Sequence, residues 1–217
     1  MKLNPVKCAF GVSVGKFIGF MVTQRGIEVN PNQIKAVMEM STPNCKNELQ
    51  HLTSQLTTLG RFIAWFTDKL KSFFLTLKWA SAIRWTSECE TTFEKIKRYL
   101  TQPPILSSLQ FSEQLYMYLA VSDCAISVIL FRCVNDKEQR SVYYVSKAMV
   151  NAKTRYSNME YTTLALRSVA RKLYHYFQAH QVIVLTNQLL RNIMHKPDLS
   201  ERLVRWAIEL SEYGIKY

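Results

Sequence analysis

The chain has 217 residues and a formal net charge of +12, with a sequence pI near 9.5. Hydrophobic residues make up 48% of it and charged residues 20%, which predicts a packed core in one large or two small domains rather than a low-complexity chain. A globular chain this basic favours a polyanionic partner, nucleic acid or an anionic membrane surface, although such charge can also serve solubility alone.

The cysteines and the N-terminus indicate where the protein resides. Five cysteines lie far apart, none in a C-x-x-C pair, and four histidines are scattered, so neither a zinc site nor a disulfide framework is expected. No signal-peptide pattern begins the sequence, and no run approaches the about 20 apolar residues that a membrane span needs. We predict an intracellular protein, in a cytoplasmic particle or in the nucleus, without a membrane partner.

The first half of the chain predicts two short strands followed by helices. Residues 6–22 are rich in β-branched and aromatic residues, which indicates two strands joined by a turn. Asn30 before Pro31 is typical of a helix start, because the amide caps the helix and proline suits its first position. Further helices are expected where apolar residues recur at spacings of three and four, over 49–59, 61–78 and part of 84–104. A linker, Ile105–Glu113, follows.

The second half predicts a sheet with helices. Three strands are expected first, at Leu115–Val121, Ala125–Arg132 and Arg140–Val145, and a long helix follows at Asn158–Phe177. A fourth strand is expected at Gln181–Leu185, two helices at 188–194 and 200–212, and the start of a fifth strand at 213–217. This order predicts an α/β sandwich in which an antiparallel hairpin precedes a crossover.

Several segments, in this order along the chain, carry a resemblance to a known family: "KCAFGVSVGKFIGFMVTQRGIEVNP", "LTTLGRFIAWFTDKLKSFFLTLK", "WTSECETTFEKIKRYLTQPPIL", "VYYVSKAM", "RYSNMEYTTLALRSVARKLYHYF" and "VLTNQLLRNIM". The chain resembles the pol polyprotein of gypsy-class LTR retrotransposons, particularly those of plants, from the end of the reverse transcriptase palm into the ribonuclease H domain. Because several motifs recur in the family's order, the resemblance is specific.

The resemblance implies a division of the chain into three parts. Residues 1–30 are expected to be the end of the palm with the primer grip, 31–110 the helices of the thumb and connection, and 111–217 a degenerate ribonuclease H-like domain that ends early. The expected fold class is α/β (α+β), with a small strand pair and helices before a ribonuclease H-like mixed sheet. The family's polymerase aspartates lie upstream of the primer grip, so no polymerase activity is expected of this chain.

The nuclease site of the family needs acidic side chains to hold two divalent cations about 4 Å apart. The resemblance places the first aspartate at Ala120, the glutamate at Glu160, the third acid at Asn187 and the fourth beyond Tyr217. One carboxylate cannot offset two such ions, so no metal is expected unless the domain is active with magnesium or manganese. Asp123 is a substitute acid only if the turn redirects it; otherwise it is a turn residue.

Binding does not need the metals, because phosphates are contacted by lysine and arginine. Each candidate is equally compatible with a solvated surface. The predicted nucleic-acid contacts are Lys16, Gly19, Phe20 and Arg25 around the primer grip, Arg61, Lys69 and Lys71 on the thumb, and Arg167, Arg171 and Lys172 on the long helix.

Three functions remain open from the sequence. The first is an inactive part of a retrotransposon reverse transcriptase/ribonuclease H that binds RNA–DNA hybrid or DNA as a scaffold, together with the rest of the pol polyprotein. The second is a ribonuclease H that works with Glu160, Asp123 and Asn187. The third is a basic structural or interaction module without a nucleic-acid role. We favour the first.

Overall fold

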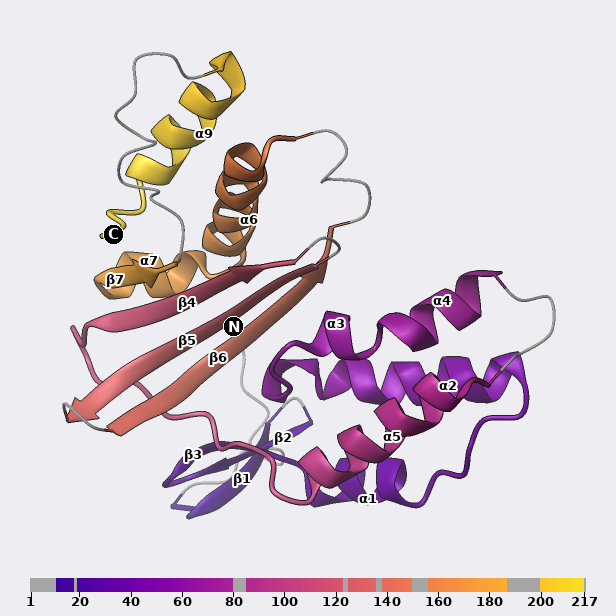
Figure 1. The fold of residues 1–217 in the computed structure, drawn as a ribbon. Helices are drawn as coiled ribbons and strands as arrows, with labels where there is room; N and C mark the ends of the chain where they lie inside the picture. Colours follow the sequence, from indigo (N-terminus) through magenta and orange to yellow (C-terminus); the bar gives the residue numbers. More distant parts are fainter. Residues whose placement is uncertain are drawn as a thin grey trace, which may run out of the picture.

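The computed structural model of the chain describes residues 11–17, 19–79, 85–122, 125–135, 138–149, 156–186 and 200–216. Its first part is a small antiparallel sheet of β1 (Val14–Phe17), β2 (Phe20–Thr23) and β3 (Gly26–Val29), in that order (Figure 1). Within the strand pair predicted over 6–22, residues 6–10 lie outside the described residues, β1 and β2 are the two strands observed, and β3 adds a third strand. It was missed because the turn at Gly26 leads directly into pairing with β2, and the four residues of β3 are too few to show an alternating pattern.

Helices follow, and they share one hydrophobic core with the small sheet. They are α1 (Pro31–Met38), α2 (Lys46–Thr58), the short 3-10 helix η2 (Gly60–Phe62), α3 (Phe66–Lys69), α4 (Lys71–Trp79) and α5 (Ser87–Leu100). The predicted start of α1 is confirmed, since the side chain of Asn30 accepts a hydrogen bond from the backbone N–H of Asn32 over 3.1 Å. Phe20 and Val29 are buried in the same cluster as Leu52 and Phe93.

A second sheet has the strand order β6-β5-β4-β7. Its elements are β4 (Leu115–Val121), β5 (Ala125–Asn135), β6 (Glu138–Ala148), α6 (Asn158–Lys172), α7 (Tyr174–Ala179), β7 (Val182–Leu185) and α9 (Glu201–Ser211). Strands β4, β5 and β6 are antiparallel neighbours, and β7 returns parallel to β4 after the crossover. The predicted mixed sheet is confirmed.

Two details of this half differ from the sequence prediction. The long helix divides at Leu173 into α6 and α7, and the expected fifth strand is a single parallel bridge between Ile183 and Lys216. The helix expected over 188–194 lies outside the described residues. The second core lies between the sheet and α6, where Leu115, Met117 and Leu166 are buried.

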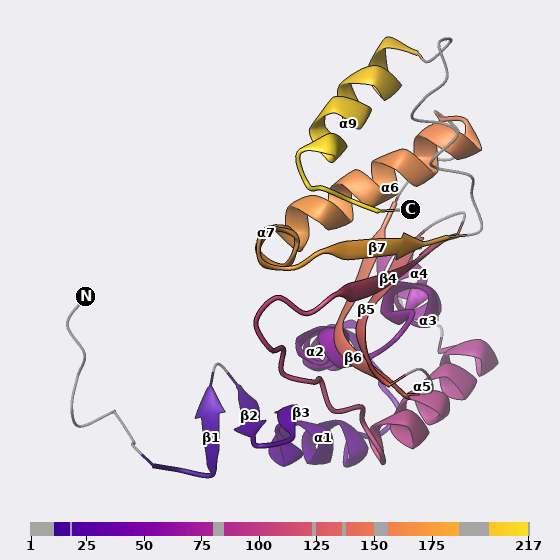
Figure 2. The same cartoon turned by 90° about the vertical axis from the view of Figure 1, so that its left-hand side faces the viewer.

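The sheet has helices on both faces. Helices α6 and α9 lie on one side of it, and the helical half of the chain lies on the other (Figures 1 and 2). The buried residues form one cluster within 20–106 and another within 115–210. The division into 1–30, 31–110 and 111–217 stays a prediction, but these clusters put the small sheet and the helices together. In the described ranges, no helix is long and apolar enough to span a bilayer.

The linker joins the two halves through backbone hydrogen bonds. Leu106 and Ile27 of β3 exchange two of them, over 2.8 and 2.9 Å, and the N–H of Ser107 donates to the carbonyl of Ser141 on β6 over 2.7 Å. Gly26 makes the first contact possible. It has a φ of +137°, and a Cβ at this position would lie 2.1 Å from the carbonyl oxygen of Leu106.

We predict that Gly26→Ala lowers the free energy of unfolding by about 2 kcal/mol or more, because the new methyl group collides with backbone and the φ angle is strained. Urea unfolding measures this change. Gly214→Ala is the matched control, since Gly214 has a φ of +58° but open space around it. Equal losses in the two variants would mean that the linker contact does not constrain Gly26.

Candidate nucleic-acid interface and candidate nuclease site

Position 120 belongs to a row of small side chains that crosses the second sheet. Ala120 lies opposite Ser127 of β5, and Ser127 lies opposite Ser146 of β6, so all three point to the same face. The preceding residue, Leu119, is buried in the core beneath α6. Because side chains alternate along a strand, the methyl group of Ala120 points to the opposite face.

The beginning of α3 packs on this row. The backbone N–H of Thr67 donates to Ser146 Oγ over 2.9 Å. Asp68 accepts hydrogen bonds from Ser122 Oγ over 2.8 Å and from Ser127 Oγ over 3.4 Å. The carboxylate that contacts this row therefore comes from the helical half of the chain. The sequence held no signal for it, since 54 and 59 positions separate Asp68 from these two serines.

Glu160 completes the N-terminal cap of α6. Its carboxylate accepts hydrogen bonds from the backbone N–H of Ser157 over 3.0 Å and from Ser157 Oγ over 3.2 Å. In return, Ser157 Oγ accepts from the N–H of Glu160, which forms a capping box. Ser200 Oγ, at the start of α9, donates to the second oxygen over 3.2 Å. These donors, the Ser157 N–H first, hold the pKa of Glu160 below its ordinary value.

The described residues do not fit the metal pair that the resemblance implies. Ala120 offers no ligand, and Glu160 is bonded to helix donors. Among the residues that the structure describes, no three His, Cys, Asp or Glu side chains lie close enough together to hold a metal ion. Asp123 and Asn187 lie outside the described residues, so their predicted roles stay predictions.

A groove of about 440 Å³ lies between the helical half and the second sheet. Gln33, Arg61, Tyr143 and Lys172 are among the residues that line it, from α1, η2, β6 and α6. We call it the Arg61 groove. It brings together Arg61 and Lys172, which were predicted separately as phosphate contacts.

Cations gather at the Arg61 groove, and no acid is among the described residues that line it. The pKa of Lys172 is lowered, first by burial and then by the positive charges of Arg61 and Lys147. The guanidinium of Arg61 lies 4.2 Å from the ring centre of Phe20 and 5.8 Å from that of Tyr143. Within the described ranges none of these three cations pairs with a carboxylate, so the groove suits an anion. Lys147 was missed because nothing in the sequence marks it among the other exposed lysines.

The structure does not place the four predicted primer-grip residues on one surface. Phe20 is buried and packs 5.6 Å from Phe62, so it supports Arg61 rather than offering a free ring. Gly19 adopts a φ of +81° beside Gln33, and Lys16 is exposed on β1. Arg25 lies instead at the turn between β2 and β3, where it pairs with Glu28 over 3.1 Å.

The other predicted cations have neighbours of their own. Lys69 lies 4.6 Å from the ring centre of Tyr99, and burial lowers its pKa. Lys69 and Lys71 both line a cavity of about 280 Å³ that also contains the acids Asp68 and Glu88. This mixture of charges is less suited to a polyanion than the Arg61 groove.

The arginines of α6 are held by an acid on α9. Arg167 Nε donates to Glu209 over 2.6 Å, and Arg171 binds the other oxygen of the same carboxylate. These contacts fasten α9 to α6 and lower the net charge of that surface. Lys172 is thus the predicted cation of α6 that keeps its charge unpaired in the part of the chain that the structure describes.

Comparison with known proteins shows what the chain resembles. Residues 85–184, just under half of the chain, match the model of the RNase H-like domain found in reverse transcriptase. Over 219 aligned positions the chain is 25% identical to the transposon Tf2-3 and Tf2-4 polyproteins of Schizosaccharomyces pombe, covering 99% of this chain and 16% of those relatives. The predicted resemblance to LTR retrotransposon polyproteins is confirmed. The plant type stays a prediction.

Solved structures agree on the fold. The chain superposes on a foamy viral protease–reverse transcriptase in complex with an RNA/DNA hybrid, with a TM-score of 0.77, 19% identity and coverage of 94% of this chain and 28% of that one. The same viral protein in complex with dsDNA gives a TM-score of 0.76, 19% identity and coverage of 94% and 44%. The chain therefore shares the fold of the corresponding part of these viral structures.

We predict that Glu160 contributes to stability in a pH-dependent way. Because its pKa is lowered in the folded chain, its contribution is present above the ordinary value of 4.5 and is lost as the pH falls through the lower folded value. Urea unfolding of the wild type and Glu160→Gln should differ at about pH 6, and this difference should shrink towards about pH 2.5. A difference that is constant over this pH interval would contradict a stabilising role of the ionised Glu160 carboxylate in the helix cap.

Proposed function

We propose that this chain is a nucleic-acid-binding scaffold of a retrotransposon reverse transcriptase, which holds an RNA–DNA hybrid without cutting it. The Arg61 groove carries the proposal, because Arg61 and Lys172 line it between the thumb-like helices and the RNase H-like sheet, and Lys147 is close enough to act on the charge of Lys172. A phosphate at this site would relieve the mutual repulsion of the three cations.

The similarity to other proteins supports the choice of partner. The foamy viral neighbours are complexes with RNA/DNA hybrid and with dsDNA, and the Tf2 relatives are polyproteins. We infer that this chain likewise binds a double-stranded nucleic acid, and that its second partner is the remainder of a polyprotein. The expected compartment, a cytoplasmic particle or the nucleus, suits both.

The absence of cleavage is a proposal that rests on charge. A methyl group occupies the position that the resemblance gives to the first acid, and Glu160 is engaged by three donors at a helix terminus. Two divalent cations would meet too little negative charge there to be held together. Magnesium or manganese would be needed only by the alternative function, an active ribonuclease H.

We predict that the double variant Lys147→Gln/Lys172→Gln binds RNA–DNA hybrid about tenfold more weakly than the wild type at moderate salt. Its salt slope should fall by about 2, since each lost phosphate contact removes about one unit. Fluorescence anisotropy of a labelled hybrid at several salt concentrations measures both quantities.

The matched control is Arg171→Gln/Arg205→Gln, which removes the same charge from arginines that are paired with Glu209 and Glu201. Its affinity should change less than twofold, because neither arginine lines the Arg61 groove. Equal weakening of the two double variants would leave net charge, rather than the Arg61 groove, as the cause of binding.

Incubating the wild type with a labelled hybrid and magnesium should leave the RNA strand intact. If cleavage occurs and Glu160→Gln abolishes it, the chain is a nuclease and the scaffold proposal is wrong. Glutamine is a suitable replacement, because it is also accepted in a capping box and keeps the start of α6 folded. Gel electrophoresis of the RNA products decides between the two functions.

A further inference from the structure

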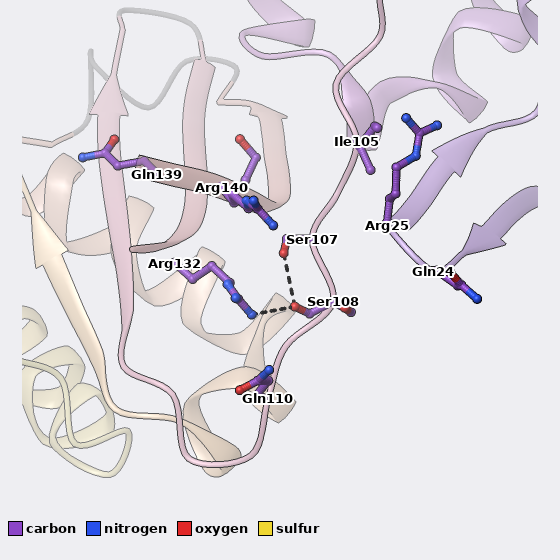
Figure 3. Close-up of a pocket in the computed structure, with 10 residues that line it drawn as sticks. Gln24, Arg25, Ile105, Ser107, Ser108, Gln110, Arg132, Gln139 and Arg140 are labelled. Atoms are coloured by element: carbon purple, nitrogen blue, oxygen red, sulfur yellow. Dashed lines mark hydrogen bonds between the residues drawn. The ribbon is translucent and has the colours of Figure 1, made fainter. Parts of the chain in front are cut away.

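A second cleft lies at the junction of the two sheets, away from the Arg61 groove. Its volume is about 790 Å³, within the range of sites for ligands the size of a nucleotide. The linker passes between two basic walls, with Arg25 on one side and Arg132 and Arg140 on the other (Figure 3). The backbone bonds of the linker to β3 and β6 hold these walls together.

Arg132 is the most buried of the three arginines. Its side chain is 13% exposed, and Nη1 donates to the carbonyl of Ser108 over 3.1 Å and to Glu113 over 3.0 Å. Its Nε is buried and lacks a hydrogen-bond partner among the described residues. A buried donor without an acceptor costs free energy, so an acceptor group of a ligand would be favourable beside it.

Arg25 and Arg140 are positioned by local ion pairs that leave donors available. Arg140 binds Glu138 through Nε over 2.7 Å, and Arg25 binds Glu28 through Nη2. Within the described ranges each guanidinium uses one nitrogen in these pairs, and both side chains are more than half exposed. Exposed pairs of this kind are weak, so a phosphate group can compete with the carboxylates.

The remaining lining of the cleft is polar. Gln24, Gln110 and Gln139 supply amides, and Ser107 and Ser108 supply hydroxyls. No acid is among the lining residues, and Ile105 is the one apolar side chain in that lining. Guanidinium, amide and hydroxyl donors together suit phosphate oxygens, whereas an apolar ligand would find almost no surface to cover.

We propose that this cleft binds phosphate groups, either of a free nucleotide or of the backbone of a single nucleic-acid strand. The site differs from the Arg61 groove in its position and in its residues. It does not depend on hybrid binding by the groove, so each site is open to a separate test.

The test measures binding of three probes to the full chain at low salt: pyrophosphate, a deoxynucleoside triphosphate and a short single-stranded oligonucleotide. At least one should bind to the wild type and should bind about tenfold more weakly to Arg25→Gln/Arg140→Gln. Both substitutions are at exposed side chains, which favours normal folding. Isothermal titration calorimetry gives the affinities.

Arg98→Gln/Arg205→Gln is the control of equal charge, since both arginines are exposed on helices outside the cleft. It should bind all probes like the wild type, and thymidine without a phosphate should not bind to either. Binding of the small phosphates identifies a nucleotide site, and binding of the oligonucleotide alone identifies a strand site; both support the proposal. The proposal is overturned if no probe binds, if thymidine binds equally well, or if the two double variants behave alike.

Discussion

The packing of α3 on the second sheet is the contact on which the arrangement of the chain depends. Thr67 and Asp68 bond to serines of the row that ends at Ala120, and this contact sets the helical half against the face opposite α6. An aspartate at position 120 would bring a second carboxylate towards Asp68. The small, uncharged side chain therefore suits close packing of the two halves.

The distribution of charge follows from this packing. Acids on or near the sheet are engaged in structure, Asp68 at the serine row and Glu160 at the start of α6. Cations at the boundaries of the two halves are less completely paired, in the Arg61 groove and in the cleft beside the linker. Cations that face open grooves in this way are suited to holding phosphates.

The sequence predicted helices and strands well where they depend on contacts between residues that are close together in the sequence. The cap at Asn30 and the alternation along β4 are of this kind, because each depends on neighbouring positions. For the candidate site, Arg61 and Lys172 were predicted from the sequence, but not that they lie at the same groove. Lys147 and Asp68 were not predicted at all. Their roles depend on partners far away in the chain, and no local pattern encodes such partners.

The sequence by itself determined the class of fold and the family resemblance, because side-chain identity and spacing suffice for these, and the resemblance in turn predicts that Ala120 stands where the family has an acid. Only the tertiary structure decided that Glu160 caps a helix, that Arg167 and Arg171 are neutralised by Glu209, and that Arg25 belongs to a different surface from Phe20. The physical reason is that the free energy of a charge depends on the groups within a few ångströms, and the tertiary structure determines which groups those are.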